Sequence, residues 1–202
     1  MTAALTGESP ADVPCVFCGI RSGPWQTSCD ASADTPSSNN AACPLCALAL
    51  HLERPRIDEE AGLLWLPEMS QQAINTTMRE IHMQLRALGE GLHVEYRMRL
   101  DTPDRRALHH ARATLADRTA MAAARLGTSA PRELGSALRR LSPGASSRRA
   151  TLLGGLRLLP LGQFYEGGTD VYPEIVDTWL ALAKPASQRS LPVAPNRLFR
   201  RR

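Results

Sequence analysis

The clearest helical pattern in the chain lies between residues 70 and 89. Apolar side chains recur there at spacings of three and four residues, which places them on one face of a helix. Ser70 is a suitable N-cap for this helix, and Gly89 is a natural end. The residues of the apolar face are Ile74, Met78, Ile81, Leu85 and Leu88.

Three more helices are predicted toward the C-terminus. Thr102 followed by Pro103 is typical of a helix start, and the apolar pattern continues from there as one helix to Leu126. A short helix is expected from Pro131 to about Leu141, and a last one over 172–183. The apolar positions are Leu108, Ala111, Leu115, Ala122 and Leu126 in the long helix, and Ile175, Val176, Trp179 and Leu182 in the last one.

Three other segments predict β-strands. GLLWL at 62–66 and LLGGLRLLPLG at 152–162 are short apolar runs, which are typical of buried strands. Residues 93–100 alternate apolar and polar side chains, the period of a half-buried strand. SPGASS at 142–147 is expected to be a loop. Helices and short strands together indicate an α+β fold class.

Both ends of the chain and one internal stretch lack any apolar period. Residues 1–13 are expected to be a disordered leader, 184–202 a basic disordered tail, and 30–42 a flexible polar loop. Residues 14–183 are therefore expected to form a single domain, which suits a chain of 202 residues.

Composition changes this picture in two ways. Aromatic residues make up only 4% of the chain, so the core must consist mainly of leucine, alanine, valine and isoleucine. No apolar run is long enough to span a membrane, and the first residues lack the features of a signal peptide. We therefore expect a cytoplasmic protein, in which thiols stay reduced and clustered cysteines indicate metal ligands rather than disulfides.

The formal net charge of +4 is carried by the tail. Six basic residues and no acid lie in 184–202, so the rest of the chain has a small negative net charge. A nearly neutral body is not what a domain built to follow nucleic-acid phosphates requires. Nucleic acid is therefore not expected as the main partner, although binding through the arginine-rich tail is an alternative hypothesis.

Two Cys-x-x-Cys pairs, Cys15 with Cys18 and Cys43 with Cys46, are the strongest functional signal in the sequence. Each pair places two thiolates on a tight turn, and four thiolates in a tetrahedron are typical ligands of a structural zinc ion. The second pair leads into a segment of helical periodicity, so the order of knuckle, hairpin and helix predicts a treble-clef unit. Cys29 is expected to be a free thiol, and its replacement of one ligand is the alternative. Two further readings of the pairs are buried cysteines without metal and a redox site.

A treble clef with such cysteine pairs is also the scaffold of HNH nucleases. Nuclease chemistry needs a histidine as general base and a second ligand that holds a divalent metal at the phosphate. No histidine lies between Cys18 and Cys43, and His51 stands alone on the expected helix. We therefore predict an HNH-like scaffold without catalytic residues and without a small-molecule substrate. A nuclease that uses His51 is the alternative.

The cysteine pairs are combined with LPEMSQ at 66–71, LLPLG at 158–162 and YPEIVDTW at 172–179. Together these segments resemble the IcmJ (DotN) family of type IVB secretion and related conjugation systems, over most of residues 15–183. The resemblance implies a zinc-bearing HNH-like fold without nuclease activity. It also implies an accessory subunit of the type IV coupling complex, at the cytoplasmic face of the inner membrane. Such a subunit binds the cytoplasmic extension of the coupling ATPase together with other subunits of the complex. Only the four cysteines of the two pairs carry over residue by residue, as zinc ligands.

The function that the sequence favours is thus a non-catalytic, zinc-stabilised adaptor that helps to recruit substrates to the coupling ATPase. Three aromatic residues are candidates either for the core or for a partner interface: Trp65, Tyr172 and Trp179.

Overall fold

The computed structural model of the chain describes residues 13–29 and 40–184. Helices and short antiparallel strand pairs make up this part, which confirms the mixed α and β class. The elements are η2 (Gly23–Trp25), β1 (Thr27–Ser28), β2 (Ala41–Ala42), α1 (Pro44–Leu50), α2 (Ile57–Glu60), β3 (Ala61–Trp65), α3 (Gln71–Ala87), α4 (Pro103–Ala116), α5 (Thr119–Leu126), α6 (Pro131–Arg139), α7 (Pro143–Leu152), β4 (Leu156–Pro160), β5 (Tyr165–Glu166), β6 (Thr169–Asp170) and α8 (Tyr172–Ala183).

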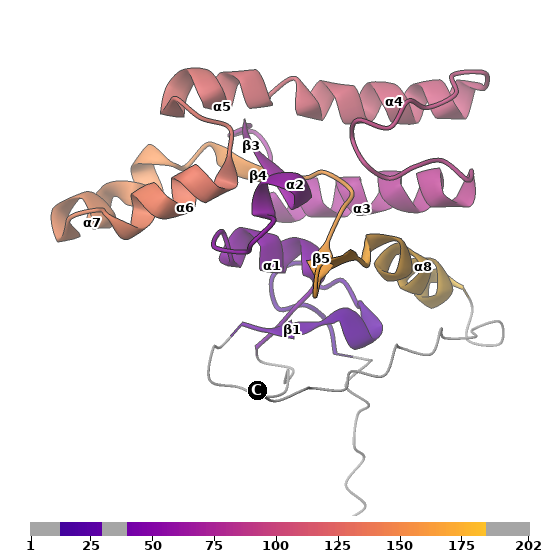
Figure 1. Cartoon of the computed structure of the whole chain (residues 1–202), viewed down its shortest axis with the longest axis horizontal. Coiled ribbons are helices and arrows are strands. Elements are labelled where there is room, and N and C mark those ends of the chain that lie inside the picture. The colour runs from indigo at the N-terminus through magenta and orange to yellow at the C-terminus, as the bar shows by residue number, and fades with distance from the viewer. Residues whose placement is uncertain (1–12, 30–39, 185–202) are drawn as a thin grey trace, which may run out of the picture.

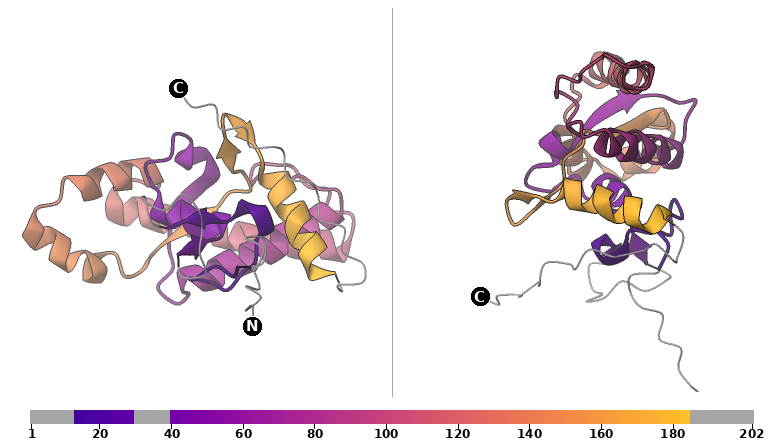
Figure 2. Two further views of the ribbon diagram at one scale, coloured as in Figure 1. Left: turned by 90° about the horizontal axis from the view of Figure 1, so that it is seen from below. Right: turned by 90° about the vertical axis from the view of Figure 1, so that its right-hand side faces the viewer.

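The elements are stacked in layers (Figure 1). Helices α4 and α5 form one outer layer, and α3 lies beneath them beside the β3–β4 pair. Helices α1 and α8 come next, and the N-terminal segment with β1 and β2 forms the opposite end. Helices α6 and α7 project from one side of this stack in the views of both Figure 1 and Figure 2.

Two of the expected strands are present and pair with each other, although the second is shorter than predicted, because Leu152 still belongs to α7 and the strand begins at Leu156. Strand β3 runs antiparallel to β4, with Ala61 opposite Pro160 and Trp65 opposite Leu156. The buried side chains of this pair include Leu63, Leu64, Leu158 and Leu159, as the apolar runs predict. This pairing joins segments about ninety residues apart in the chain, and helix α5 packs along it.

Helix α3 also follows the sequence prediction. The Ser70 hydroxyl accepts a hydrogen bond from the backbone N–H of Ala73 at 3.1 Å, the expected N-cap. Gly89 adopts a positive φ of 69° just after the helix end, where a side chain would be strained. The predicted apolar face is buried except for Leu88, which is partly exposed.

The strand predicted over 93–100 is wrong, since this segment is irregular. The buried guanidinium of Arg112 donates hydrogen bonds to the carbonyl oxygens of His93 and Tyr96, at 3.1 and 3.3 Å. These carbonyl groups are therefore satisfied by a side chain instead of a neighbouring strand. The alternating pattern could not reveal this, because the arginine that replaces the strand partner lies in the next helix.

The single helix predicted from Thr102 to Leu126 is interrupted in the structure. Helix α4 ends at Ala116 and α5 begins at Thr119. Between them, the Arg118 carbonyl accepts a hydrogen bond from the Trp65 N–H at 3.2 Å. This contact ties the break to the edge of β3. The predicted buried face is also wrong at Ala111, which is exposed.

The loop predicted over 142–147 is wrong as well, because these residues begin helix α7. Ser142 is its N-cap, and its hydroxyl accepts a hydrogen bond from the Ala145 N–H at 3.4 Å. The prediction overlooked this start signal, a serine cap followed by proline at the first helical position. The other two helices predicted in this half are confirmed as α6 and α8.

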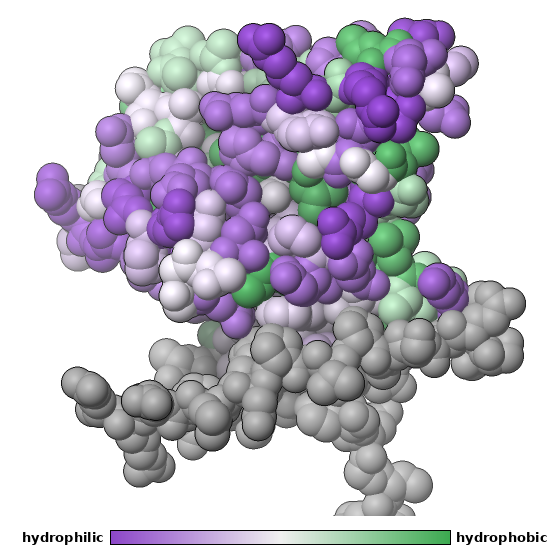
Figure 3. All heavy atoms as spheres, turned by 45° about the vertical axis from the view of Figure 1, so that its right-hand side comes forward, coloured by the Kyte–Doolittle hydropathy of each residue, from purple (hydrophilic) through white to green (hydrophobic). Residues whose placement is uncertain are grey.

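The terminal segments and the polar loop fall mostly outside the described residues. Only Val13 of the predicted leader and Lys184 of the predicted tail belong to the described part. The last residues of the stretch predicted as a loop, Ala41–Ala42, form β2 instead and are fully buried. Among the described helices, none combines the length and apolar character needed to cross a membrane. On the face shown in Figure 3, hydrophobic residues lie in several separate groups among hydrophilic ones.

Helices α3 and α8 meet in an aromatic cluster at the centre of the molecule. Tyr172 and Trp179 are fully buried, so both belong to the core, whereas Trp65 is half-buried beneath the guanidinium of Arg125. The Nδ1 atom of His82 lies 2.7 Å from the Tyr172 hydroxyl, and their rings meet edge to face. Burial, with a smaller contribution from Arg112, lowers the pKa of His82 to about 3.

We expect this histidine to make stability depend on pH. Between pH 6.5 and 3 the unfolded chain binds a proton at His82 that the folded chain does not, so stability falls as the pH falls. Urea unfolding should therefore give a free energy of unfolding about 1 kcal/mol lower at pH 5.5 than at pH 7.0 from this group alone. The difference should disappear in His82→Gln and persist in His109→Gln, whose side chain is exposed. Equal pH slopes in both variants would contradict the assignment.

Candidate metal centre

The first cysteine pair lies on a tight loop near the start of the described chain. The Cys15 N–H donates to the Ile20 carbonyl at 3.0 Å, and the Gly19 N–H donates to the Cys15 carbonyl at 2.8 Å. Gly19 has a φ of 70°, which lets the chain reverse direction directly after Cys18. This loop therefore directs two sulfur atoms to the same side.

The second pair lies at the start of α1. Cys43 is the N-cap residue, Pro44 occupies the first helical position, and Cys46 is one turn further along. Strand β2 places this helix start beside the first loop, because the Val16 N–H donates to the Ala41 carbonyl at 2.9 Å. Strand β2 also pairs with β1, with Thr27 opposite Ala42 and Ser28 opposite Ala41.

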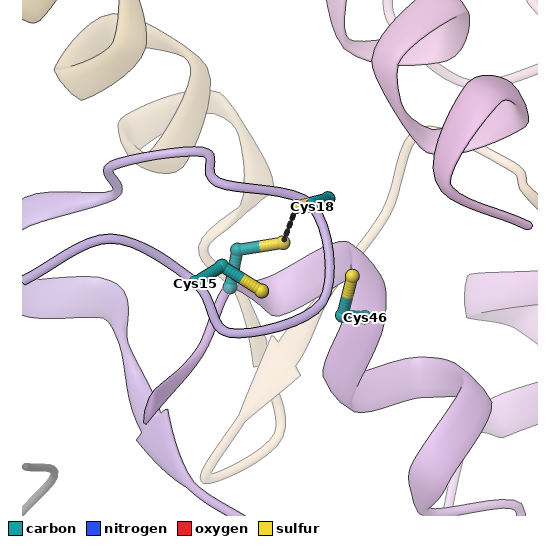
Figure 4. A group of neighbouring side chains, drawn as sticks. Cys15, Cys18 and Cys46 are labelled. Carbon is teal, nitrogen blue, oxygen red and sulfur yellow. Dashed lines mark hydrogen bonds between the residues drawn. The ribbon is translucent and has the colours of Figure 1, made fainter. Parts of the chain in front are cut away.

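The sulfur atoms of Cys15, Cys18, Cys43 and Cys46 lie within 4.8 Å of one another. Figure 4 shows Cys15 and Cys18 on the loop and Cys46 on the helix, and its dashed line marks the 3.5 Å contact between Cys18 and Cys43. In a tetrahedron with metal–sulfur distances of 2.3 Å, the sulfurs would be roughly 3.8 Å apart. The cluster therefore has a size that could hold one metal ion. Cys29 does not belong to it, as expected.

The cluster lies in the hydrophobic core, where a second negative charge is costly. The pKa of Cys15 is lowered, because the Cys18 thiol and the two remaining thiols of the cluster donate hydrogen bonds to its sulfur. The pKa of Cys43 is raised, because its thiol donates to Cys15 and the other sulfurs and because it is buried. A divalent ion would compensate the negative charge of the thiolates, which fits a site made of four thiols.

A side chain from another helix contacts the cluster. Asn75 on α3 is fully buried, and its Nδ2 atom donates a hydrogen bond to the Cys46 sulfur at 3.3 Å. Gln71 lies one turn earlier and donates to the Asn75 Oδ1 atom at 2.9 Å, which orients the amide. Gln71 also exchanges two hydrogen bonds with the backbone of Leu158 on β4, both of 2.7 Å. The cysteine cluster is thereby connected to the central strand pair.

Sequence reasoning missed both of these residues. The one available signal is their spacing, since a glutamine and an asparagine four residues apart lie on the same face of the predicted helix. Gln71 and Asn75 lie near Ile74 and Met78 on the helix surface. They therefore belong to the buried face of this helix and not to its polar face.

Helix α8 holds the N-terminal segment through two tryptophans. The indole N–H of Trp25 donates to the Thr178 hydroxyl, and that of Trp179 donates to the Ser22 hydroxyl, each at 2.9 Å. All four side chains are buried. The C-terminal helix therefore fastens the segment that follows the first cysteine pair, a contact across more than 150 residues.

The histidine considered for catalysis lies away from the cysteines. His51 follows the last residue of α1, whereas the second pair lies at the first turn. Its Nδ1 atom is 3.0 Å from a carboxylate oxygen of Glu53, and both side chains are well exposed. Within the described part of the chain, the four cysteines are the one group of three or more metal-binding side chains whose ligand atoms converge.

Comparison with protein-family models gives no match to this chain, and comparison with curated proteins gives none either. The resemblance described above therefore stays a prediction, which rests on the motifs of the sequence.

We predict that the cluster binds one metal ion per chain. Replacement of a ligand in Cys43→Ser should abolish stoichiometric binding and lower the melting temperature, because the buried cluster loses its fourth thiolate. Cys29→Ser removes a thiol outside the cluster and should keep the full metal content. Elemental analysis of the purified proteins measures both. Full metal retention in Cys43→Ser would contradict the site.

We also predict that Asn75 supports metal affinity without being a ligand. In Asn75→Leu the Cys46 sulfur loses its hydrogen-bond donor, and loss of such an outer contact typically weakens metal binding about 10- to 100-fold. Competition with a chromogenic chelator measures the affinity. Gln72→Leu makes the same kind of change at an exposed position of the same helix and should leave the affinity at the wild-type value. Equal affinities of the two variants would rule out this role.

Proposed function

We propose that the chain is a non-catalytic adaptor subunit of a type IV secretion or conjugation coupling complex, stabilised by one structural zinc ion. Cys15, Cys18, Cys43 and Cys46 would be the ligands of this ion. In this role the protein binds the cytoplasmic extension of the coupling ATPase at the inner membrane and helps to recruit substrates.

The observation that carries the structural role of the metal is the number and burial of the donors. Four protein sulfurs fill the tetrahedron that zinc prefers, and they leave no position for water or substrate. Three of the four cysteines are buried, and residues of α3 and α8 enclose the unit. Zinc at such a site would supply folding free energy by joining two loops that have few contacts of their own.

The order of elements around the cysteines supports a treble-clef, HNH-like unit. A knuckle, an antiparallel strand pair and a helix follow one another, with one cysteine pair in the knuckle and the other at the helix start. A nuclease of this kind would place a catalytic histidine beside a second metal. His51 is instead paired with Glu53 at the far end of α1.

The segments that carry the resemblance to the secretion family form or cap helices and strands of this chain. LPEMSQ caps α3 and supplies Gln71, and LLPLG contains the last three residues of β4. YPEIVDTW forms the part of α8 that contacts the N-terminal segment. The resemblance thus extends to residues that support the metal-binding unit. This agreement favours a shared scaffold, from which the coupling ATPase follows as the proposed partner.

The test is binding of the purified full chain to the cytoplasmic extension of the cognate coupling ATPase. We expect a stable complex in size-exclusion chromatography that is lost when a chelator removes the metal, while Cys29→Ser binds like the wild type. Incubation with supercoiled plasmid and magnesium or manganese serves as the parallel assay. Failure to form the complex would overturn the adaptor role, and nicking that is lost in His51→Ala would replace it with a nuclease.

A further inference from the structure

The hairpin of α6 and α7 stands apart from the rest of the fold. It covers residues 131–152, here called the arm, and projects from the side of the stack in Figures 1 and 2. Helix α6 is held at its base, where the backbone N–H of Arg132 donates to Asp58 at 2.9 Å. None of the side chains described in α7 is buried. A ten-residue helix with no buried face has little to stabilise it in water.

The arm is strongly basic. It contains five arginines and one acidic residue, Glu133, whereas acidic and basic residues nearly balance in the remainder of the described chain. Arg132 is paired with Asp58. Arg140, Arg148 and Arg149 are exposed and have no carboxylate partner within the described residues. The positive charge is therefore available to an anionic partner.

Apolar side chains accompany this charge. Leu141 and Leu152 are 38% and 63% exposed, and Leu152 lies one turn after Arg148 and Arg149 on the same face of α7. At the base of the arm, a groove of about 490 Å³ separates α6 from the end of α1. Its lining includes Ala49, Leu50, Leu52, Gly135, Leu138 and Arg139.

Gly135 allows α6 to lie close to the chain after α1. A Cβ atom at Gly135 would lie 2.9 Å from the Leu52 Cβ atom, so a larger residue would clash with Leu52 at this contact. The lining contains one acidic side chain, Glu53, and one basic side chain, Arg139. The three arginines that have no carboxylate partner among the described residues lie on the rest of the arm and add positive charge to it.

We propose that the arm and this groove dock a segment of a partner protein that carries acidic residues beside apolar ones, as an amphipathic helix does. Its apolar side chains would contact the groove and the exposed leucines, and its carboxylates would pair with Arg140, Arg148 and Arg149. Burial of a face of α7 would stabilise that helix in the complex. The proposal rests on the adaptor function given above, since it identifies where an adaptor would hold its partner.

The composition of the arm favours a protein over a nucleic acid. Surfaces that bind single strands combine basic residues with aromatic side chains on which bases stack. The arm has no aromatic residue, and its exposed apolar side chains are leucines. Exposed leucines beside arginines suit a peptide that has both apolar and acidic side chains.

The first probe is a synthetic 18-residue peptide of leucine and glutamate at helical spacing, followed by fluorescence anisotropy with the full chain. We expect binding that weakens at least about tenfold in Arg148→Glu/Arg149→Glu, because two attractive charges become repulsive. Arg97→Glu/Arg106→Glu makes the same change in net charge at exposed positions outside the arm and should bind like the wild type. Leu141→Ala/Leu152→Ala should weaken binding while it leaves every charge in place.

Three results would overturn the proposal. One is equal loss of affinity in the two charge-reversal variants, and another is equal binding of a peptide with lysine in place of glutamate. The third is arm-dependent binding of duplex DNA that Leu141→Ala/Leu152→Ala leaves unchanged, which would assign the arm to nucleic acid. Melting temperatures of all variants show whether the fold is intact.

A second measurement separates this proposal from the adaptor function. The same variants are tested against the cytoplasmic extension of the coupling ATPase. If the extension binds the wild type and the arm variant equally, the adaptor function stands and the arm proposal fails. If the extension does not bind but the acidic peptide binds through the arm, the coupling ATPase is not the partner, while the arm remains a docking surface for acidic segments.

Discussion

Four thiols from two segments of the chain have to converge on one point, and the N-terminal half of the fold depends on this. The strand pair that lies between the two segments in the chain is only two residues long on each side. Such a ladder cannot hold two loops in register on its own. Burial also disfavours negative charge on Cys43 and Cys46 unless a cation compensates it. Metal binding at this cluster would therefore be coupled to the local fold.

This unit is nevertheless not an independent module. Asn75 reaches the Cys46 sulfur from α3, and Gln71 connects that amide to β4. Trp25 and Trp179 cross between the N-terminal segment and α8. Elements from the middle and the end of the chain thus complete the environment of a site whose ligands all lie in the first 46 residues. A structural metal in this protein would organise the whole stack and not only the loops that bind it.

The sequence was informative where one segment decides its own structure. The spacing of the cysteine pairs identifies the cluster, and the period of α3 with its Ser70 cap identifies the helix. The sequence was misleading where the structure of a segment depends on a side chain or strand that is distant in the chain. The alternation over 93–100 is real, but Arg112 takes the carbonyl groups that a strand would use. The roles of Gln71 and Asn75 depend on β4 and on Cys46, which no local pattern places beside them.

The net charge of the sequence also does not show where the charges lie in the fold. It attributed the basic character to the tail, because the acidic residues of the other segments cancel the remaining arginines in the sum. The fold separates these charges in space and leaves the arm basic while the rest of the described chain is nearly neutral. Helix α1 then connects the two features of the molecule: its first turn carries Cys43 and Cys46, and its last residues, Ala49 and Leu50, line the groove beside the arm. A seven-residue helix has little freedom to move at one end while the other is held, so a metal bound at its start would also define the wall of the groove.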